Sequence, residues 1–264
     1  VVHLPNTLLG EVENEFTVHQ NTMNIVQALY LNNAVEPFDN ELVRQAMYYA
    51  IDVDEIIEFV CSGAGVATGT SMYPAQSKYF MPELAENYQK DVEKAKELLA
   101  QAGYPDGFSM TITAPSNYAQ HMDTAMVLIE QLKAVGITAE LIPVEWQSWV
   151  DDVYRGRNYQ STVCGIAADD MTAREMLVRY MSDNRKNFIA FSDPEYDEVM
   201  AQAMASTDDA EQTALYKRAQ EILNERAASL WLQDACELVV MNPELEGFTF
   251  YRTYVIDMAA ISRK

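Results

Sequence analysis

Two pairs of adjacent aspartates are the side chains of this sequence that come nearest to acid–base machinery. They are Asp151–Asp152 and Asp169–Asp170. Carboxylates that are neighbours in sequence rarely converge on one substrate atom, and no histidine stands beside either pair to act as a proton carrier. The histidines are scattered without a metal-binding repeat, at His3, His19 and His121. We therefore expect solvated carboxylates here, and neither a hydrolase nor another enzyme.

The cysteines offer little more chemistry than the aspartates. They are Cys61, Cys164 and Cys236, far apart and without a metal-ligand spacing such as CxxC. We interpret them as buried, idle thiols, because free cysteine packs readily as a small apolar group. A bridge such as Cys61–Cys236 remains open, and with it the redox compartment. With thiols and imidazoles so dispersed, we expect no metal ion and no other cofactor.

The charge of the chain limits its partners. Its 264 residues include 18 basic and 40 acidic side chains, a net charge of -22 at pH 7. Such a field disfavours nucleic acid and anionic membrane surfaces, so we expect neutral or cationic partners. No run approaches the roughly twenty apolar residues of a membrane span, and residue 1 does not open a signal segment. We expect any signal segment to lie upstream or to have been removed.

The elements that must position these side chains alternate between helix and strand. Apolar spacing predicts one helix over 41–60, another from Asp91 to Gly103, and a third over about 119–136 whose inward face carries Met122, Ala125, Met126, Ile129 and Leu132. Alternation predicts strands over 107–114, 137–144, 159–166 and 230–240. A strand, a helical crossover and a second strand indicate a right-handed βαβ unit. The expected fold class is α/β, with a mixed, mostly parallel sheet flanked by helices.

Five segments in order resemble the solute-binding proteins of family 5, which serve ABC importers. The first is Asn33–Ala46, with its Pro-Phe-Asp turn and Val-Arg-Gln-Ala helix, continuing to Ala50-Ile51-Asp52. The others are 91–99 with 102–104 and 107–108, then 131–133 with 136–137, then 191–197, then 247–248. Each segment is weakly specific when taken singly, but five in the correct order are strongly specific.

The resemblance implies a two-lobed clamp of which this chain is the second part. It implies a periplasmic-binding-protein-like lobe, with residues 1–35 near the hinge, 36–235 forming the C-terminal ligand-binding lobe, and 236–264 returning toward a first lobe that is absent here. The implied function is capture of di- or oligopeptides outside the cytoplasmic membrane, as a periplasmic protein or cell-surface lipoprotein. The implied partners are the permease subunits and the first lobe, and the protein is expected to be a monomer.

The resemblance also indicates ligand-binding residues. The stretch Gly165–Asp169 corresponds to the end of a cleft strand, where Gly165 and Ile166 precede an aspartate that pairs with the ligand's α-amino group. A carboxylate in a closing, partly dry cleft binds an ammonium strongly, because the effective dielectric falls. The competing interpretation of Asp169 is a helix N-cap or a solvated charge.

Three more residues complete the predicted site. Trp146 matches the family's cleft tryptophan, although core packing is an equal alternative. Tyr118 and Asn32 are predicted to line the cleft, whereas Trp149 is assigned to the core. Ile166 replaces a tryptophan common in peptide binders, so we expect a less aromatic pocket. A nickel chelate or another small solute is the alternative ligand.

Overall fold

Strands from both ends of the chain meet in one mixed sheet. The computed structural model describes residues 1–168, 172–251 and 255–264. Its strands are β1 (Val2–Leu4), β2 (Thr17–Leu31), β3 (Val66–Ala67), β4 (Ser109–Pro115), β5 (Thr138–Val144), β6 (Ser161–Ile166) and β7 (Leu230–Met241). They lie in the order β1-β7-β2-β6-β4-β5, with β3 also paired to β7. A separate small hairpin joins β8 (Leu245–Glu246) to β9 (Ser262–Arg263).

Parallel pairing is concentrated where the strand–helix–strand unit was predicted. β4 runs parallel to β5 and to β6. The pairs that β7 makes with β1, β2 and β3, and the pair of β2 with β6, are antiparallel. The predicted α/β class and mixed sheet are therefore confirmed, with the antiparallel part supplied by the two long strands β2 and β7.

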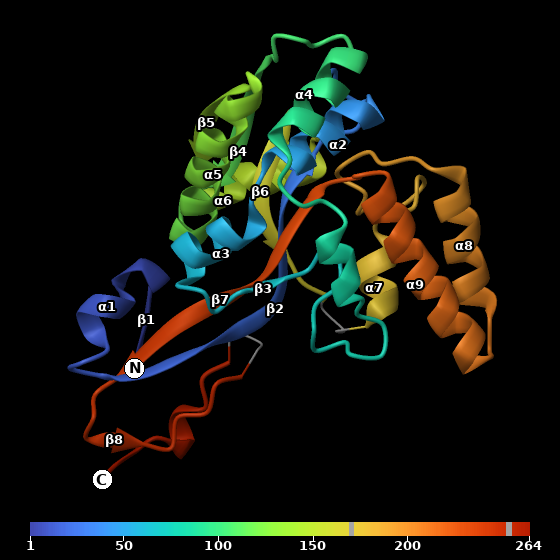
Figure 1. Ribbon diagram of the computed structural model, residues 1–264. Coiled ribbons are helices and arrows are strands. Elements are labelled where there is room, and N and C mark those ends of the chain that lie inside the picture. Colours follow the sequence, from blue (N-terminus) through green and yellow to red (C-terminus); the bar gives the residue numbers. More distant parts are fainter. Residues whose placement is uncertain (169–171, 252–254) are drawn as a thin grey trace.

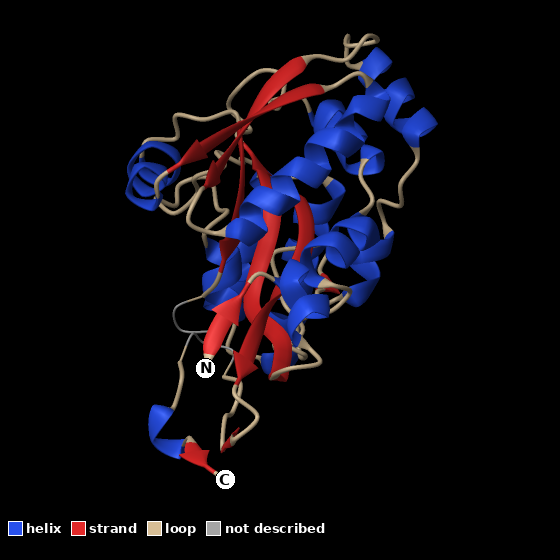
Figure 2. Cartoon of the chain, turned by 90° about the vertical axis from the view of Figure 1, so that its left-hand side faces the viewer, coloured by secondary structure: helices blue, strands red, loops and turns tan. Residues whose placement is uncertain are grey.

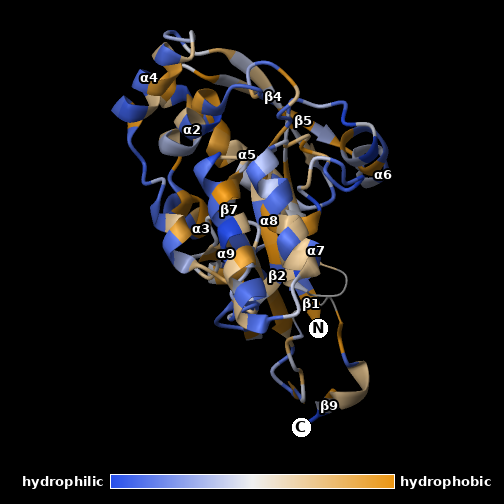
Figure 3. Cartoon of the chain, turned by 90° about the vertical axis from the view of Figure 1, so that its right-hand side faces the viewer, coloured by the Kyte–Doolittle hydropathy of each residue, from blue (hydrophilic) through white to orange (hydrophobic). Residues whose placement is uncertain are grey.

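The helices form two groups beside the long strands (Figure 1). The first group contains α2 (Glu41–Ala50), α3 (Val53–Cys61), α4 (Val92–Gln101) and α5 (Ala119–Leu132), and the second α7 (Ala173–Val178), α8 (Pro194–Ala205) and α9 (Asp209–Glu225). Short helical segments are α1 (Leu9–Val12), α6 (Trp146–Ser148), the π-helical turn η4 (Trp149–Arg155), and the 3-10 turns η1 (Asn6–Leu8), η2 (Pro82–Glu86), η3 (Lys133–Val135) and η5 (Met258–Ala260). Figure 3 shows mixed polarity on α8 and α9, in front of the hydrophobic strand β2. Within the described residues no helix is long and apolar enough to cross a bilayer.

The prediction of a single helix over 41–60 is wrong. The helix is interrupted at Ile51 and Asp52, which separate α2 from α3. Both residues are extended, and the Asp52 carboxylate accepts a hydrogen bond from the Glu55 N–H at 3.0 Å, which begins α3. Gln131 of α5 holds the break in place. Its Oε1 accepts from the Asp52 N–H at 3.0 Å and its Nε2 donates to the Asp52 carbonyl at 3.2 Å. A contact distant in sequence thus overrides the local helical periodicity.

The predicted inward face of α5 is rotated in the structure. Met126 is 53% exposed, whereas Leu128 is fully buried. The buried face also carries His121, Thr124 and Gln131. Each of these polar side chains has a hydrogen-bond partner in the lobe, which offsets the cost of its burial. A prediction from apolar spacing alone therefore assigned the wrong residues to the buried face of α5.

The two long strands project beyond the sheet's parallel part. Val26 of β2 pairs with Ile166, the last residue of β6, so residues 17–22 of β2 continue past the end of β6 and pair with β7. Both chain termini lie at this end of the molecule (Figures 1 and 2). The carboxyl ends of β4, β5 and β6 consequently face the same direction as the projecting strands.

Candidate functional site

The carboxyl ends of the parallel strands bring two loops together. Pro115 at the end of β4 pairs with Val144 at the end of β5. The Ser116 N–H donates to the Val144 carbonyl at 2.8 Å, and Asn117 Oδ1 accepts from the Trp146 N–H at 3.1 Å. In open α/β sheets this edge is where ligands bind, because the loops that leave the strands are free to differ.

The two loops place Tyr118 and Trp146 side by side, as an aromatic pair. Their ring centroids lie 5.5 Å apart in an edge-to-face arrangement. Tyr118 is 41% exposed and Trp146 is 37% exposed. Trp146 stacks on Trp149 at 5.2 Å. Trp149 itself is buried and donates its Nε1–H to Thr162 Oγ1 at 2.9 Å, so its predicted core role is confirmed. A core residue therefore supports an exposed aromatic surface.

The predicted residues Gly165 and Ile166 lie at the end of β6, beside β2. A Cβ on Gly165 would come within 2.2 Å of the Ile25 side chain, so glycine permits this close approach of the strands. Ile166 is 8% exposed and pairs with Val26. Asp169 lies outside the residues that the structure describes.

Asn32 lies away from the other predicted residues. It follows the end of β2 that pairs with Ser161, whereas Gly165 and Ile166 are at the opposite end of β6. Its side chain is 3% exposed and donates to the carbonyls of Tyr159 at 2.9 Å and Arg157 at 3.1 Å. The structure thus places Asn32 in a backbone contact and not beside the aromatic pair.

Sequence reasoning did not identify His121 as part of this edge. The Gly165 N–H donates to His121 Nε2 at 3.2 Å, and the side-chain amide of Gln27 lies 2.9 Å from Nδ1. The Tyr118 ring is 5.5 Å from the imidazole. Burial lowers the pKa of His121 to about 4. The neutral imidazole therefore connects α5 to the end of β6 under the aromatic pair.

This histidine predicts a pH dependence of stability. The folded state keeps His121 neutral down to a pKa of about 4, while the unfolded chain takes up the proton near pH 6.5. Stability is therefore fully present above pH 6.5 and falls by up to about 3 kcal/mol as the pH drops to 4. We expect His121→Gln to remove most of this loss, because its amide does not titrate. Urea unfolding of both proteins between pH 5 and pH 7 tests this, and parallel pH profiles would contradict it.

One cavity adjoins the edge, and a larger one lies beside the second group of helices. The smaller, of about 240 Å³, lies between the first turn of α5 and β1. It is lined by His3, Leu4, Pro5, Asn6, Val60, Asn117, Tyr118, Ala119, Gln120, Asp123, Cys236 and Glu237. Tyr118 therefore connects the aromatic pair to this cavity.

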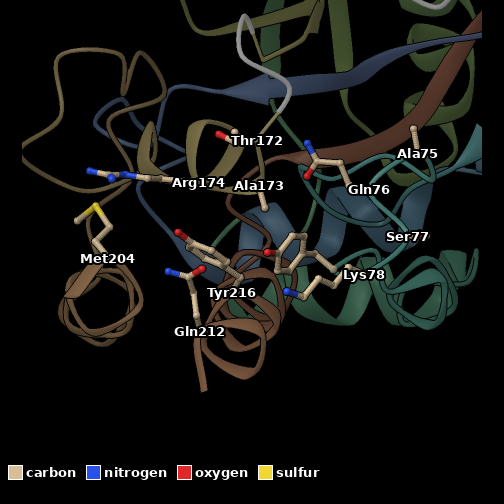
Figure 4. Close-up of a pocket in the computed structure, with 11 residues that line it drawn as sticks. Ala75, Gln76, Ser77, Lys78, Thr172, Ala173, Arg174, Met204, Gln212 and Tyr216 are labelled. Carbon is tan, nitrogen blue, oxygen red and sulfur yellow. The ribbon is translucent and has the colours of Figure 1, made fainter. Parts of the chain in front are cut away.

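The larger cavity, of about 700 Å³, lies between the loop 75–79 and helices α7, α8 and α9 (Figure 4). Its lining includes two basic side chains, Lys78 and Arg174, and the aromatic rings of Tyr79 and Tyr216. Lys78 forms an ion pair with Asp209. No sequence signal indicated this cavity, because its lining comes from separate segments of the chain. Thr172 and Ala173 in its lining follow Asp169 closely in sequence.

The described residues contain no cluster of three or more histidine, cysteine, aspartate or glutamate side chains arranged to hold a metal ion. What the edge presents is an exposed aromatic pair, buried polar support and the smaller cavity. Such a combination of apolar wall and convergent polar groups suits the reversible binding of a small solute.

Comparison with known proteins gives consistent matches. A model of "Bacterial extracellular solute-binding proteins, family 5 Middle" matches residues 2–188. Heme-binding protein A of Haemophilus influenzae is 27% identical over 239 residues, covering 88% of this chain and 43% of that protein. Di/tripeptide-binding protein 1 of Pseudomonas aeruginosa is 31% identical over 198 residues, covering 72% of this chain and 36% of that protein.

A solved structure matches over almost the whole chain. The crystal structure of a dipeptide-binding protein from Pseudoalteromonas sp. SM9913 in complex with Met-Leu has a TM-score of 0.82 and 25% identity, covering 97% of this chain and 52% of that one. The chain thus spans about half, or less, of the length of the proteins it matches.

Proposed function

The chain belongs to the bacterial extracellular solute-binding proteins of family 5, and we propose that it forms one wall of a cleft that captures di- or oligopeptides. The predicted family and periplasmic-binding-protein-like fold are confirmed by the family match and by the fold likeness. Capture takes place outside the cytoplasmic membrane, and the peptide passes to the permease subunits of an ABC importer. The relatives that are named for peptide binding support this ligand class.

The observation that carries the proposal is the exposed aromatic pair at the carboxyl edge of β4 and β5. Tyr118 and Trp146 present flat, apolar surfaces that tolerate different peptide side chains. Asp169, by its position after β6, supplies the carboxylate that pairs with the peptide's α-amino group. Gly165 and Ile166 hold the strand end that leads to it. The protein binds its solute and changes no covalent bond in it.

The proposed arrangement is a lobe joined to a second lobe by long strands. Residues 36–235 form the lobe, residues 1–35 lie near the hinge, and residues 236–264 return toward the first lobe. The projection of β2 and β7 past the end of β6 supports this arrangement. The coverage of about half of each relative's length supports it as well. We propose that the two-lobed protein is a monomer.

Calorimetric titration of a two-lobed form of the protein with Met-Leu and with N-acetyl-Met-Leu tests the ligand class. The free dipeptide should bind, and acetylation should weaken binding by at least about tenfold, since it removes the ammonium that a buried carboxylate would pair with. A nickel chelate serves as the comparison ligand. Binding of the chelate without binding of any peptide would contradict the proposal.

The same titration with residues 1–264 alone tests the two-lobed arrangement. One wall buries only part of a ligand, and closure requires the opposite lobe. We expect the affinity of residues 1–264 for Met-Leu to be at least about a hundredfold weaker than that of the two-lobed protein, because about half of the contacts are lost. Equal affinities would contradict the arrangement.

A further inference from the structure

The fold brings together two of the three cysteines from opposite ends of the chain. Cys61 is the last residue of α3, and Cys236 lies within β7. The Cys236 Sγ is 3.6 Å from the Cys61 carbonyl oxygen. The side-chain amide of Gln20 donates to the same carbonyl at 3.0 Å and to the Cys236 Sγ at 3.7 Å. Both cysteines are fully buried.

We propose that Cys61 and Cys236 are a redox modification site, which closes to a disulfide between α3 and β7 when the protein meets a disulfide oxidant. The bond joins residues 175 positions apart in sequence. It anchors β7 just after this strand has passed the end of β6, where β7 continues toward the chain terminus. The family's extracellular location is a compartment in which disulfides form and persist.

The surroundings give the pair a route to reagents. Cys236 and Val60, the neighbour of Cys61, both line the cavity of about 240 Å³ beside β1. Cys236 is therefore the member of the pair that borders this cavity. The hydrogen bond between the two thiol groups lowers the pKa of Cys61 and raises that of Cys236, so the proton is kept on Cys236. Cys61 is therefore the more acidic thiol of the pair.

The exchange is balanced in atoms and electrons. The thiolate of one cysteine of the pair attacks one sulfur of the oxidant, the oxidant's S–S bond breaks, and one small thiolate leaves. The other cysteine then gives up its proton and attacks the sulfur of the first, which expels the second small thiolate. Two protein thiols are oxidised by two electrons, and one small disulfide is reduced to two thiols.

The third cysteine provides a control within the same molecule. Cys164 lies on β6, on the other side of β2 from β7. Burial raises the pKa of Cys164 to about 12, and its Sγ contacts the Gly165 carbonyl at 3.5 Å. A reaction governed only by general thiol oxidation would treat all three buried thiols alike.

Tryptic mapping of the native protein after equilibration with oxidised and reduced glutathione tests the site. The three cysteines fall on separate tryptic peptides, 45–78, 158–174 and 227–252. We expect a non-reduced species that joins 45–78 to 227–252 and is lighter than their sum by two hydrogens, with 158–174 recovered as free thiol. The melting temperature should rise by about 5–10 °C on oxidation. Cys61→Ser and Cys236→Ser should each abolish both changes.

Two results would overturn the proposal. One is the recovery of 45–78 and 227–252 as free thiols or as separate glutathione adducts. The other is a linked species that contains 158–174. Because the mapping is done on the unaltered protein, both results can be read even where a serine variant fails to fold.

Discussion

Replacing Trp146 by alanine should weaken Met-Leu binding by about tenfold or more and leave the fold intact. The side chain is 37% exposed at the carboxyl edge, and it stacks on Trp149 at 5.2 Å. Aromatic anchors of this kind contribute about 2 kcal/mol or more to binding when a ligand covers them. Removal of an exposed ring has little effect on folding, because the supporting Trp149 stays in the core. Calorimetry and thermal unfolding of the two-lobed protein measure both quantities.

Met126→Ala is the matched control for this substitution. Met126 is a large apolar side chain that is 53% exposed, but it lies on the outer face of α5. Its removal should change neither affinity nor stability measurably. If Trp146→Ala binds Met-Leu as tightly as the unaltered protein, the aromatic pair does not line the cleft.

Replacing Arg44 by methionine should destabilise the lobe by about 3–5 kcal/mol and lower its melting temperature by about 10 °C. Arg44 is 6% exposed, and its guanidinium donates to three carbonyl oxygens. The acceptors are Ala227 at 3.1 Å, Phe38 at 2.8 Å and Arg226 at 3.0 Å. Methionine fills much of the volume but leaves these carbonyls without their donor. The contacts that tie α2 to the end of α9 are then lost.

Arg218→Met is the comparison that separates hydrogen bonding from charge pairing. Arg218 forms ion pairs with Glu195, Glu221 and Glu225, but its side chain is 35% exposed. Solvent screens such pairs, so its loss should cost about 1 kcal/mol or less. In chemical denaturation, the free energy of unfolding should therefore be much lower for Arg44→Met than for Arg218→Met. An equal loss in both would show that the buried carbonyl contacts are not the main source of the effect.

Helices and strands were predictable where their ends are fixed by residues that are close in sequence. Asn40 and Asp91 accept hydrogen bonds from the first turns of α2 and α4, and Gly136, with a positive φ of 81°, ends the turn after α5. The break at Asp52 was not predictable, because it depends on Gln131, 79 residues away. The same limit applies to α5, whose buried polar face depends on partners in β2, β6 and the start of α3.

The candidate site was predictable in part. Motif order indicated Trp146 and Tyr118, and the structure brings these two together at one edge. The sequence did not show at which end of the sheet Asn32 lies, because that depends on the antiparallel pairing of β2 with β6. His121 escaped notice because its partners, the Gly165 N–H and the side chain of Gln27, are distant in sequence. The larger cavity assembles residues from separate segments, and only the fold reveals it.

Hydroxyl-radical footprinting of the two-lobed protein, with and without saturating Met-Leu, tests most directly whether this edge lines the peptide cleft. The account predicts that the peptide protects Trp146 and Tyr118 from oxidation, while Met126 and the exposed Phe59 of α3 are oxidised equally in both states. Unchanged oxidation of Trp146 and Tyr118 under conditions where Met-Leu binds would contradict it.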